Sequence, residues 1–515
     1  MPRPPTRPAG PSRRARPRLA LLAVAALRCC GVLLALAAAG CTSLLVADTR
    51  PLPQAKLEPP GAERISHGGY RLDSLSPSPE AAQDFIVLVA FSGGGKRSAA
   101  FGYGALRGMR ALMVQTPQGP RSLLSQVDAI SGVSGGSFPA AYYGLHRDAT
   151  FGNFERDFLY DDTNSYIWGI YLLPWNWGWL VRPGLGTNDY MDRIYDRTMF
   201  HGATFRDLQA RGRPLIAIGA TDISYGTPVL FDQNYFDLIC ADLQDLPVSR
   251  AVAASNGFPG LFSPVTLTSR TAECGGRRPG WLGRVPAAER ANPLSRLATA
   301  AVRAERYLDP ERTRYLHLAD GGISDNLAMR AAGSTMQALT GDDLRSRGFL
   351  QVRRLLMLSV DGQGTQDSSV AQRKQVGGLV QMLGLVSGAQ IDSYNFETLH
   401  TVTQQIEGLT ATLRQARCAA APSIAGAPCG DVASALIHIS LVGLPETPER
   451  ARLLAIPTGL SLSREDVDLL IAAGEGAVTG SATLRDFLDS YPAGAPGPRA
   501  AVQVSEGGAV TARRR

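Results

Sequence analysis

The sequence predicts an α/β protein with three layers, in which helices cover both faces of a mainly parallel sheet. Apolar runs of strand length alternate with segments whose apolar residues recur at helical spacing, which is typical of this class. The runs are continuously apolar, as expected for strands that are buried on both faces. The chain has 515 residues, of which 44% are hydrophobic and 19% charged, so a sizeable core is expected.

The predicted strands and helices follow one another in repeated units. Residues 84–91, "DFIVLVAF", form the first predicted strand, and a glycine turn and a helical pattern at 97–113 follow it. The stretch "VDAISGVSGGSFPAAYYGLH" at 127–146 repeats the order of strand, glycine turn and helix. Further apolar runs at 214–223 and 353–362 predict more strands of the same sheet.

Changes in composition predict the boundaries along the chain. A stretch rich in Pro, Ser and Gly precedes the first strand and predicts a flexible tether. Another strand is predicted at 435–444, and the sequence leaves open whether it joins the sheet or belongs to a subdomain. The expected segments are a signal at 1–40, the tether at 41–83, a main domain at 84–332 with an insertion at 270–293, a C-terminal α/β extension at 333–492 and a disordered tail at 493–515.

The first forty residues predict an export signal. An arginine-rich start precedes an apolar run from Leu19 to Ala39, and "LAAAGC" ends at Cys41. The Ala-Gly pair before Cys41 resembles the bacterial lipoprotein signal, in which that cysteine is lipidated and becomes the first residue. Thr42 after the cysteine favours sorting to the outer membrane of the cell envelope. A plain signal peptide and a retained membrane anchor are the alternatives, since a run of about 20 apolar residues can span a bilayer.

The net charge of +7 comes from the same leader, because residues 1–40 hold seven arginines and no acidic residue. The remainder is about neutral, so a nucleic-acid partner is not expected.

Four of the seven cysteines lie beyond Cys41, and an oxidising compartment would permit up to two disulfides. Cys418 and Cys429 close a short loop and are the more natural pair, but the sequence leaves the pairing of these two and of Cys240 and Cys274 open. The spacing of Cys and His predicts no metal site, and no cofactor is expected.

Ser134 is the candidate nucleophile. "GVSGG" at 132–136 fits the G-x-S-x-G elbow, with a predicted strand before it and a predicted helix after it. Gly132 and Gly136 would give the room that this turn needs, and the following helix would favour developing negative charge at the serine. The alternative is an ordinary glycine-rich turn.

A second glycine turn, "FSGGGKRS" at 91–98, joins the first strand to its helix. The N–H groups of Gly93, Gly94 and Gly95 could receive an oxyanion or a phosphate. A dinucleotide site is the weaker interpretation, because the glycine spacing is only approximate and no acidic residue stands convincingly about twenty positions on. A plain packing turn is the remaining alternative.

Asp320 is the candidate base, since "LHLADGGISDN" at 316–326 brings a carboxylate to a turn that contains Gly321. An ordinary Asp-Gly turn is the alternative. His400 and His438 follow Asp320 in the order of a triad, but neither lies at a recognisable turn. A carboxylate that acts directly on Ser134 is the more economical hypothesis.

In this order and at this spacing, "SGGGKRS", "GVSGG" and "DGG" resemble the patatin-like phospholipase family over residues 86–332. "AVAASNGFPGLFSPV" at 251–265 resembles the family's small-residue helix and Pro-rich segment. The resemblance implies a three-layer patatin-like fold and a Ser–Asp dyad without histidine, with Ser134 and Asp320 in those roles. It also implies an oxyanion hole at Gly93, Gly94 and Gly95, with Arg97 as the basic residue beside it. Ser98 stands where the family usually has glycine.

The resemblance implies acyl transfer from a phospholipid or related lipid ester through an acyl-enzyme. An esterase or thioesterase for soluble substrates and a non-catalytic envelope lipoprotein are the alternatives. The aromatic stretch at 166–181 contains Trp168, Trp175, Trp177 and Trp179 and predicts a lid or an interfacial loop. A buried aromatic cluster is the alternative for that stretch.

Overall fold

The computed structural model describes residues 46–47, 49–173, 176, 186–292, 294–364, 368–372, 374–375, 379–490 and 502–504. The predicted signal peptide, the predicted lipidation site at Cys41 and almost all of the predicted tail lie outside these residues. So do Trp175, Trp177 and Trp179 of the aromatic stretch.

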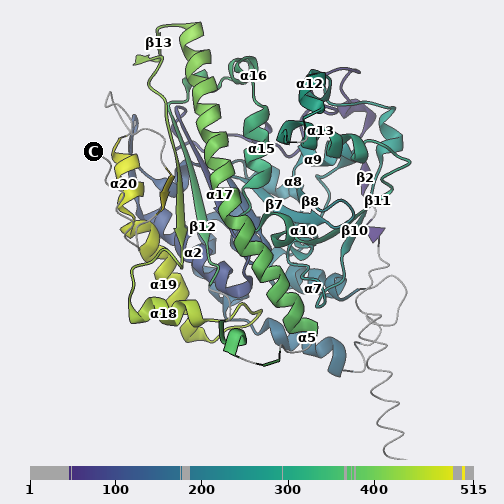
Figure 1. Cartoon of the computed structure of the whole chain (residues 1–515), viewed down its shortest axis with the longest axis vertical. Helices are drawn as coiled ribbons and strands as arrows, with labels where there is room; N and C mark the ends of the chain where they lie inside the picture. Colours follow the sequence, from purple (N-terminus) through teal and green to yellow (C-terminus); the bar gives the residue numbers. More distant parts are fainter. Residues whose placement is uncertain are drawn as a thin grey trace, which may run out of the picture.

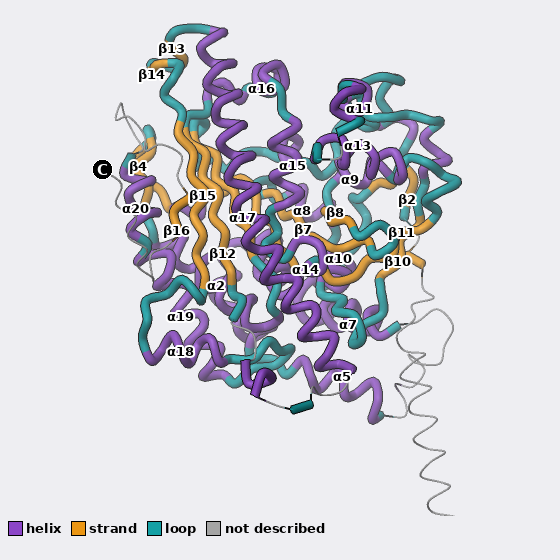
Figure 2. The backbone as a smooth tube through the Cα atoms, viewed as in Figure 1, coloured by secondary structure: helices purple, strands orange, loops and turns teal. Residues whose placement is uncertain are grey.

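Ten strands of the described chain form one sheet (Figures 1 and 2). They are β1 Val46–Ala47, β3 Phe85–Phe91, β6 Val127–Val133, β7 Leu215–Asp222, β8 Thr227–Leu230, β10 Val265–Thr268, β11 Tyr315–Asp320, β12 Arg354–Asp361, β15 Ala433–Ser440 and β16 Val502–Val504. Their order is β1-β10-β11-β7-β6-β3-β12-β15-β16, and β8 pairs with β7. Pairings from β7 through β16 along this order are parallel, whereas β11 runs antiparallel to β10 and β7. The prediction of an α/β fold with a mostly parallel sheet is confirmed.

Small two-stranded ribbons lie beside the main sheet. They are β2 Arg50–Pro51 with β9 Ala241–Asp242, β4 Met113–Thr116 with β5 Gly119–Ser122, and β13 Ser423–Ile424 with β14 Ala427–Pro428.

Helices cover both faces of the sheet, and strand β3 shows why its sequence is continuously apolar. Val87, Val89 and Phe91 pack into one core cluster, whereas Ala90 packs into a second cluster on the opposite face. Each face of β3 therefore meets apolar side chains instead of water.

The helices of the first face contribute to the larger cluster. They include α2 Gly95–Ala111, α3 Ser137–His146, α4 Thr150–Phe154, α7 Thr187–Tyr195, α8 Phe205–Ala210, α10 Val248–Ser255, α18 Pro448–Ala455, α19 Arg464–Gly480 and α20 Ala482–Asp489. The opposite face is covered by α15 Arg330–Ala338, α16 Gly341–Ser346 and the long α17 Leu379–Ala420, which crosses the front of the sheet in Figure 1. The remaining α-helices are α5 Thr163–Leu172, α9 Gln233–Leu238, α11 Trp281–Arg284, α12 Ala287–Arg290, α13 Arg296–Tyr307 and α14 Gly322–Asp325.

The C-terminal extension completes the sheet. Strand β12 lies between β3 and β15, and β15 pairs in parallel with β12 along its whole length. Helix α19 packs along α2, which follows the first core strand. The strand that the sequence left unplaced therefore extends the main sheet and shares its core.

The predicted flexible tether is wrong for the part of 41–83 that contains Tyr70 and Arg71. Tyr70 is fully buried, and its hydroxyl accepts a hydrogen bond from the backbone N–H of Ile216 at 2.7 Å. Arg71 is buried as well and forms an ion pair with Asp237. Single buried side chains hold this part of the segment against the domain, and the very short strands β1 and β2 hold the part before it, so no long periodic pattern marks the segment in the sequence.

Disulfides join Cys418 to Cys429, as expected, and Cys240 to Cys274. The second bridge ties the predicted insertion at 270–293 to the end of α9. Within the described residues, no helix combines the length and the apolar character that crossing a bilayer requires.

Candidate active site

Ser134 lies at a sharp turn between a buried strand and a helix. Strand β6 ends at Val133, a single turn of 3-10 helix spans Ser134–Gly136, and α3 begins at Ser137. The backbone φ of Ser134 is +49°, in the left-handed region that residues with a side chain rarely occupy. This strained geometry is the one that a nucleophile elbow requires.

The glycines around Ser134 allow two turns to approach each other closely. A Cβ atom on Gly135 would lie 2.0 Å from the carbonyl oxygen of Gly95, and one on Gly136 would lie 2.6 Å from that of Phe91. A Cβ atom on Gly132 would likewise lie 2.6 Å from the carbonyl oxygen of Gly136. Larger residues would push the serine turn away from the glycine loop after β3.

Asp320 is brought to Ser134 by strand β11. The Ser134 hydroxyl donates a hydrogen bond to Asp320 Oδ2 at 2.8 Å, and the Gly322 N–H donates to Oδ1 at 2.8 Å. Gly321 allows the turn, because a Cβ there would lie 2.4 Å from the Gly219 carbonyl oxygen. The two predicted residues are therefore in contact.

Burial raises the pKa of Asp320 to about 6, while the hydrogen bonds from Gly322 and Ser134 act in the opposite direction. A carboxylate in this range is a stronger base than an exposed one and is still ionised near neutral pH.

The C-terminal end of α10 holds both residues in place. The side chain of Ser255 accepts a hydrogen bond from the Ser134 N–H at 2.9 Å and donates to the Gly219 carbonyl at 2.5 Å. The Gly257 carbonyl accepts from the Asp320 N–H at 3.0 Å. One helix end thus fixes the serine backbone and the aspartate backbone together.

Asn256 is a site residue that sequence reasoning missed. Its side-chain amide is buried, and its Oδ1 position lies 3.3 Å from Ser134 Oγ. The serine hydroxyl has one proton, which it donates to Asp320, so the amide must turn its NH2 group toward Oγ to form a hydrogen bond. Tyr195, 3.2 Å from the other amide position, can then donate its hydroxyl proton to the Asn256 oxygen. The signal available was the polar pair Ser-Asn at the end of the small-residue helix "AVAASNG".

The glycine loop after β3 packs against Ser134. A Cβ on Gly93 would lie 3.4 Å from the Cβ of Ser134. The Gly93 N–H is already used, because it donates to the Asn326 carbonyl at 2.9 Å. Gly94 and Gly95 both have positive φ, and neither N–H donates to another described residue. Of the three predicted donors, Gly94 and Gly95 are therefore the two whose N–H groups can bind an oxyanion.

Arg97 fixes the glycine loop through hydrogen bonds to two neighbouring segments. Its guanidinium is buried and donates to the carbonyls of Gly362 at 2.9 Å and Ile456 at 2.7 Å. The neighbouring Lys96 N–H donates to the Gly459 carbonyl at 2.8 Å. The loop is thereby fixed to the end of β12 and to the segment that follows α18.

Helix α5, which contains the start of the aromatic stretch, lies beside this loop. The ammonium group of Lys96 donates to the Asp161 carbonyl and to the Thr163 hydroxyl, at the start of α5. Farther along the same helix, Trp168 and Leu172 are 62% and 68% exposed. The described part of the stretch is thus a helix that begins next to the glycine loop, buries Ile170 and exposes Trp168 and Leu172.

The histidines considered as alternative bases lie elsewhere. His438 is bonded to the Ser359 hydroxyl, and His400 to a side chain on its own helix.

Part of the chain matches a known protein family. Residues 89–332 match the model of the family described as patatin-like phospholipase. No curated protein sequence matches the chain.

Two solved structures are similar in part. Human GIVD cytosolic phospholipase A2, in complex with methyl gamma-linolenyl fluorophosphonate inhibitor and terbium chloride, is 14% identical with a TM-score of 0.35, over 78% of this chain and 59% of that chain. VipD from Legionella pneumophila is 12% identical with a TM-score of 0.26, over 76% of this chain and 68% of that chain. The chain thus spans about three fifths of the human protein. These TM-scores are too low for either likeness to carry an argument about fold or activity.

Proposed function

We propose that this chain, whose residues 89–332 match the model of the patatin-like phospholipase family, a family of serine hydrolases, is a phospholipase A-like acyl hydrolase. It cleaves carboxylic ester bonds of membrane lipids, with Ser134 as nucleophile and Asp320 as general base. The observation that carries this proposal is the hydrogen bond of 2.8 Å between Ser134 Oγ and Asp320 Oδ2.

The first half-reaction forms an acyl-enzyme. The Ser134 proton passes to Asp320 while Oγ attacks the ester carbonyl carbon, and the carbonyl oxygen becomes an oxyanion. The N–H groups of Gly94 and Gly95 donate to that oxyanion. The C–O bond to the leaving alcohol then breaks, and the alkoxide takes the proton back from Asp320.

The second half-reaction releases the fatty acid. Water gives a proton to Asp320 and attacks the acyl carbon, and the Ser134 Oγ leaves and recovers its proton from the same carboxyl. Asn256 donates a hydrogen bond to Oγ in both halves, which keeps the oxygen aligned and favours the negative charge that it carries as nucleophile and as leaving group.

Release of fatty acid from phospholipid vesicles tests the proposal. Wild type should release fatty acid, whereas Ser134→Ala and Asp320→Asn should each lose about 10²–10⁴-fold or more of the rate. Fluorophosphonate should label wild type and leave Ser134→Ala unlabelled. If wild type is labelled but hydrolyses only soluble esters, its substrate is a soluble ester and not a membrane lipid. If wild type is not labelled, the proposal that the protein is a serine hydrolase is wrong.

We further propose that lipidated Cys41 anchors the protein in the bacterial outer membrane. The motif "LAAAGC" supports this anchor. Cys41→Ala should shift the protein from the membrane fraction to the soluble fraction and abolish incorporation of labelled fatty acid. Unchanged fractionation and labelling of that variant would contradict the anchor without touching the catalytic proposal.

A further inference from the structure

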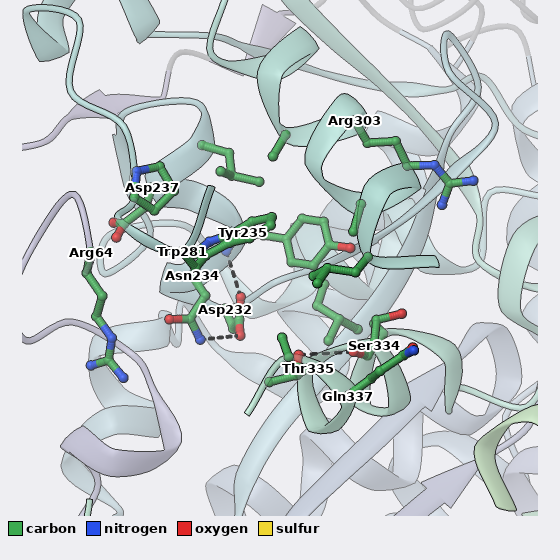
Figure 3. Close-up of a pocket in the computed structure, with 18 of the residues that line it drawn as sticks. Arg64, Asp232, Asn234, Tyr235, Asp237, Trp281, Arg303, Ser334, Thr335 and Gln337 are labelled. Carbon is green, nitrogen blue, oxygen red and sulfur yellow. Dashed lines mark hydrogen bonds between the residues drawn. The ribbon is translucent and has the colours of Figure 1, made fainter. Parts of the chain in front are cut away.

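A cavity of about 270 Å³ lies between α13 and α15, away from the candidate dyad. Strand β8 and helix α9 form its floor, and neither Ser134 nor Asp320 lines it. Figure 3 shows Arg64 and Arg303 on opposite sides, with Ser334, Thr335 and Gln337 of α15 along the lower edge. Its volume is near the lower end of the range for small-molecule sites.

The walls of this cavity are mainly apolar. Leu297, Ala300 and Ala304 occupy one face of α13, since they are three and four residues apart. Trp281 and Leu238 are only partly buried by the small cluster that surrounds them. Apolar area therefore remains available to an apolar ligand.

The acidic side chains of the cavity already have partners. Asp237 is paired with Arg71, and Glu63 is paired with Arg284. Asp232 accepts hydrogen bonds from the Tyr235 N–H at 2.9 Å and from the Asn234 amide at 3.0 Å. Asp343 caps the start of α16 and lies 3.9 Å from Arg284.

Three of the arginines, in contrast, form no ion pair within the described residues, although the charge of Arg347 helps to lower the pKa values of Asp343 and Asp73. Arg296 donates to the Thr401 hydroxyl at 2.9 Å, whereas Arg303 and Arg347 form neither an ion pair nor a hydrogen bond with any residue that the structure describes. Burial lowers the pKa of nearby Arg330, and the charges of Arg296 and Arg303 lower it further. The lining holds five arginines and four carboxyl groups, and burial raises the pKa of one of these carboxyl groups, Asp232, so the net charge of the lining is positive.

We propose that this cavity binds a single-chain anionic amphiphile such as a fatty acid. The alkyl chain lies along Leu297, Ala300 and Ala304 of α13, near Trp281, and the anionic head group pairs with Arg303 and its neighbours at the rim. An apolar wall without the arginines would accept a neutral chain equally well, and arginines without the wall would accept any small anion. The combination selects a ligand that is apolar and anionic.

Trp281 provides a direct measurement of binding to this cavity. Dodecanoate, below its micellar concentration, is titrated into the full chain that carries Ser134→Ala, and tryptophan fluorescence is recorded. We expect a saturable change that Trp281→Phe removes, because the other four tryptophans lie between residues 168 and 179. Dodecanol and dodecyltrimethylammonium should bind about tenfold more weakly or worse, since neither carries the negative charge that forms an ion pair with arginine.

Variants separate the cavity from the catalytic site. Arg303→Glu should weaken dodecanoate binding about tenfold or more, and Arg303→Gln should weaken it less. Arg312→Glu, at an exposed arginine outside the cavity, is the matched control and should bind like the parent protein. Ala300→Phe should block binding by filling the space, with thermal unfolding confirming that it is folded.

The proposal is overturned if no saturable signal from Trp281 appears, if Arg303→Glu binds normally, or if dodecanol binds as tightly as dodecanoate. None of these readouts measures ester hydrolysis, so a failure here is distinguishable from a failure of the proposed function.

Discussion

Ser134 and Asp320 share a hydrogen bond of 2.8 Å although 186 positions separate them in the chain. Strand β6 delivers the serine and β11 the aspartate, and β7 lies between the two strands in the sheet. The pair is buried, so the carboxyl has lost most of its contact with water. The predictions below follow from this burial and from the groups around the pair.

The rate of ester hydrolysis should depend on one ionisation near pH 6. Asp320 must be ionised to accept the serine proton, and burial raises its pKa to about 6. The rate should therefore be constant above this pH and fall about tenfold per pH unit well below it. A pH profile of kcat/KM measures this, and a flat profile down to about pH 4, the ordinary range of a carboxyl, would contradict the role of Asp320.

Asp320→Asn should make the folded protein more stable at neutral pH. The folded pKa of about 6 lies above the ordinary value of 3.8, so ionisation opposes folding, and stability from this group is lost as pH rises from about 4 to 6. At about 1.4 kcal/mol per pH unit, the gain is at most about 3 kcal/mol at pH 7 and vanishes near pH 4. Denaturant unfolding of both proteins at the two pH values checks this. If the two proteins differ in their free energy of unfolding by the same amount at both pH values, ionisation of Asp320 is not the cause of the difference.

Asn256→Ala should lower kcat about 10-fold to 100-fold with little change in KM, because it removes a hydrogen bond to the reacting oxygen. Asn256→Asp should in addition shift the acidic limb of the pH profile upward, since a second carboxylate raises the pKa values of the pair. Tyr195→Phe retains the amide but removes the hydroxyl that orients it, so its effect should be smaller. If the pH profile of Asn256→Asp is the same as that of wild type, the side chain at position 256 does not lie in contact with Ser134.

Arg97→Met should reduce both stability and kcat. Its guanidinium donates to the Gly362 and Ile456 carbonyls, and these buried acceptors would lose their partners at a cost of about 2–4 kcal/mol. The loop that carries Gly94 and Gly95 would then be less well fixed. Arg107→Met on the same helix is the control, because Arg107 is 42% exposed and should change stability by less than about 1 kcal/mol. Thermal unfolding measures the stability of both variants, and steady-state kinetics measures their kcat.

Trp168→Ala combined with Leu172→Ala should weaken binding to phospholipid vesicles about tenfold, since both side chains are exposed on α5 beside the glycine loop. Cosedimentation is measured in a Cys41→Ser background, so that a lipid anchor does not mask the effect. Leu294→Ala is the matched control, because Leu294 is 88% exposed and lies far along the chain from α5. Equal binding by all variants would contradict an interfacial role for α5.

The local sequence predicts the strands and the turns of this protein. Mainly apolar runs predict β3, β6, β7 and β12, because a strand that is covered on both faces places most of its side chains in the core. Glycines at 132, 135 and 136 predict the serine turn, because only glycine permits such close backbone contacts. Ser134, the glycine loop and Asp320 stand out from such local patterns, and their motifs resemble those of the patatin-like phospholipase family, whose model matches residues 89–332.

Tertiary structure decided which distant groups meet. Asn256 reaches Ser134 only because α10 ends where β6 ends, and no local pattern reports that juxtaposition. Tyr70 and Arg71 are held in the core by single contacts, so a segment without periodicity resembled a tether. Hydrogen bonds and burial act between side chains that are close in space, whereas periodicity records only neighbours along the chain. For this reason the sequence by itself determined the elements and the nucleophile turn, and the packing of distant segments decided the pKa of Asp320, the partners of Ser134 and the fixation of the glycine loop.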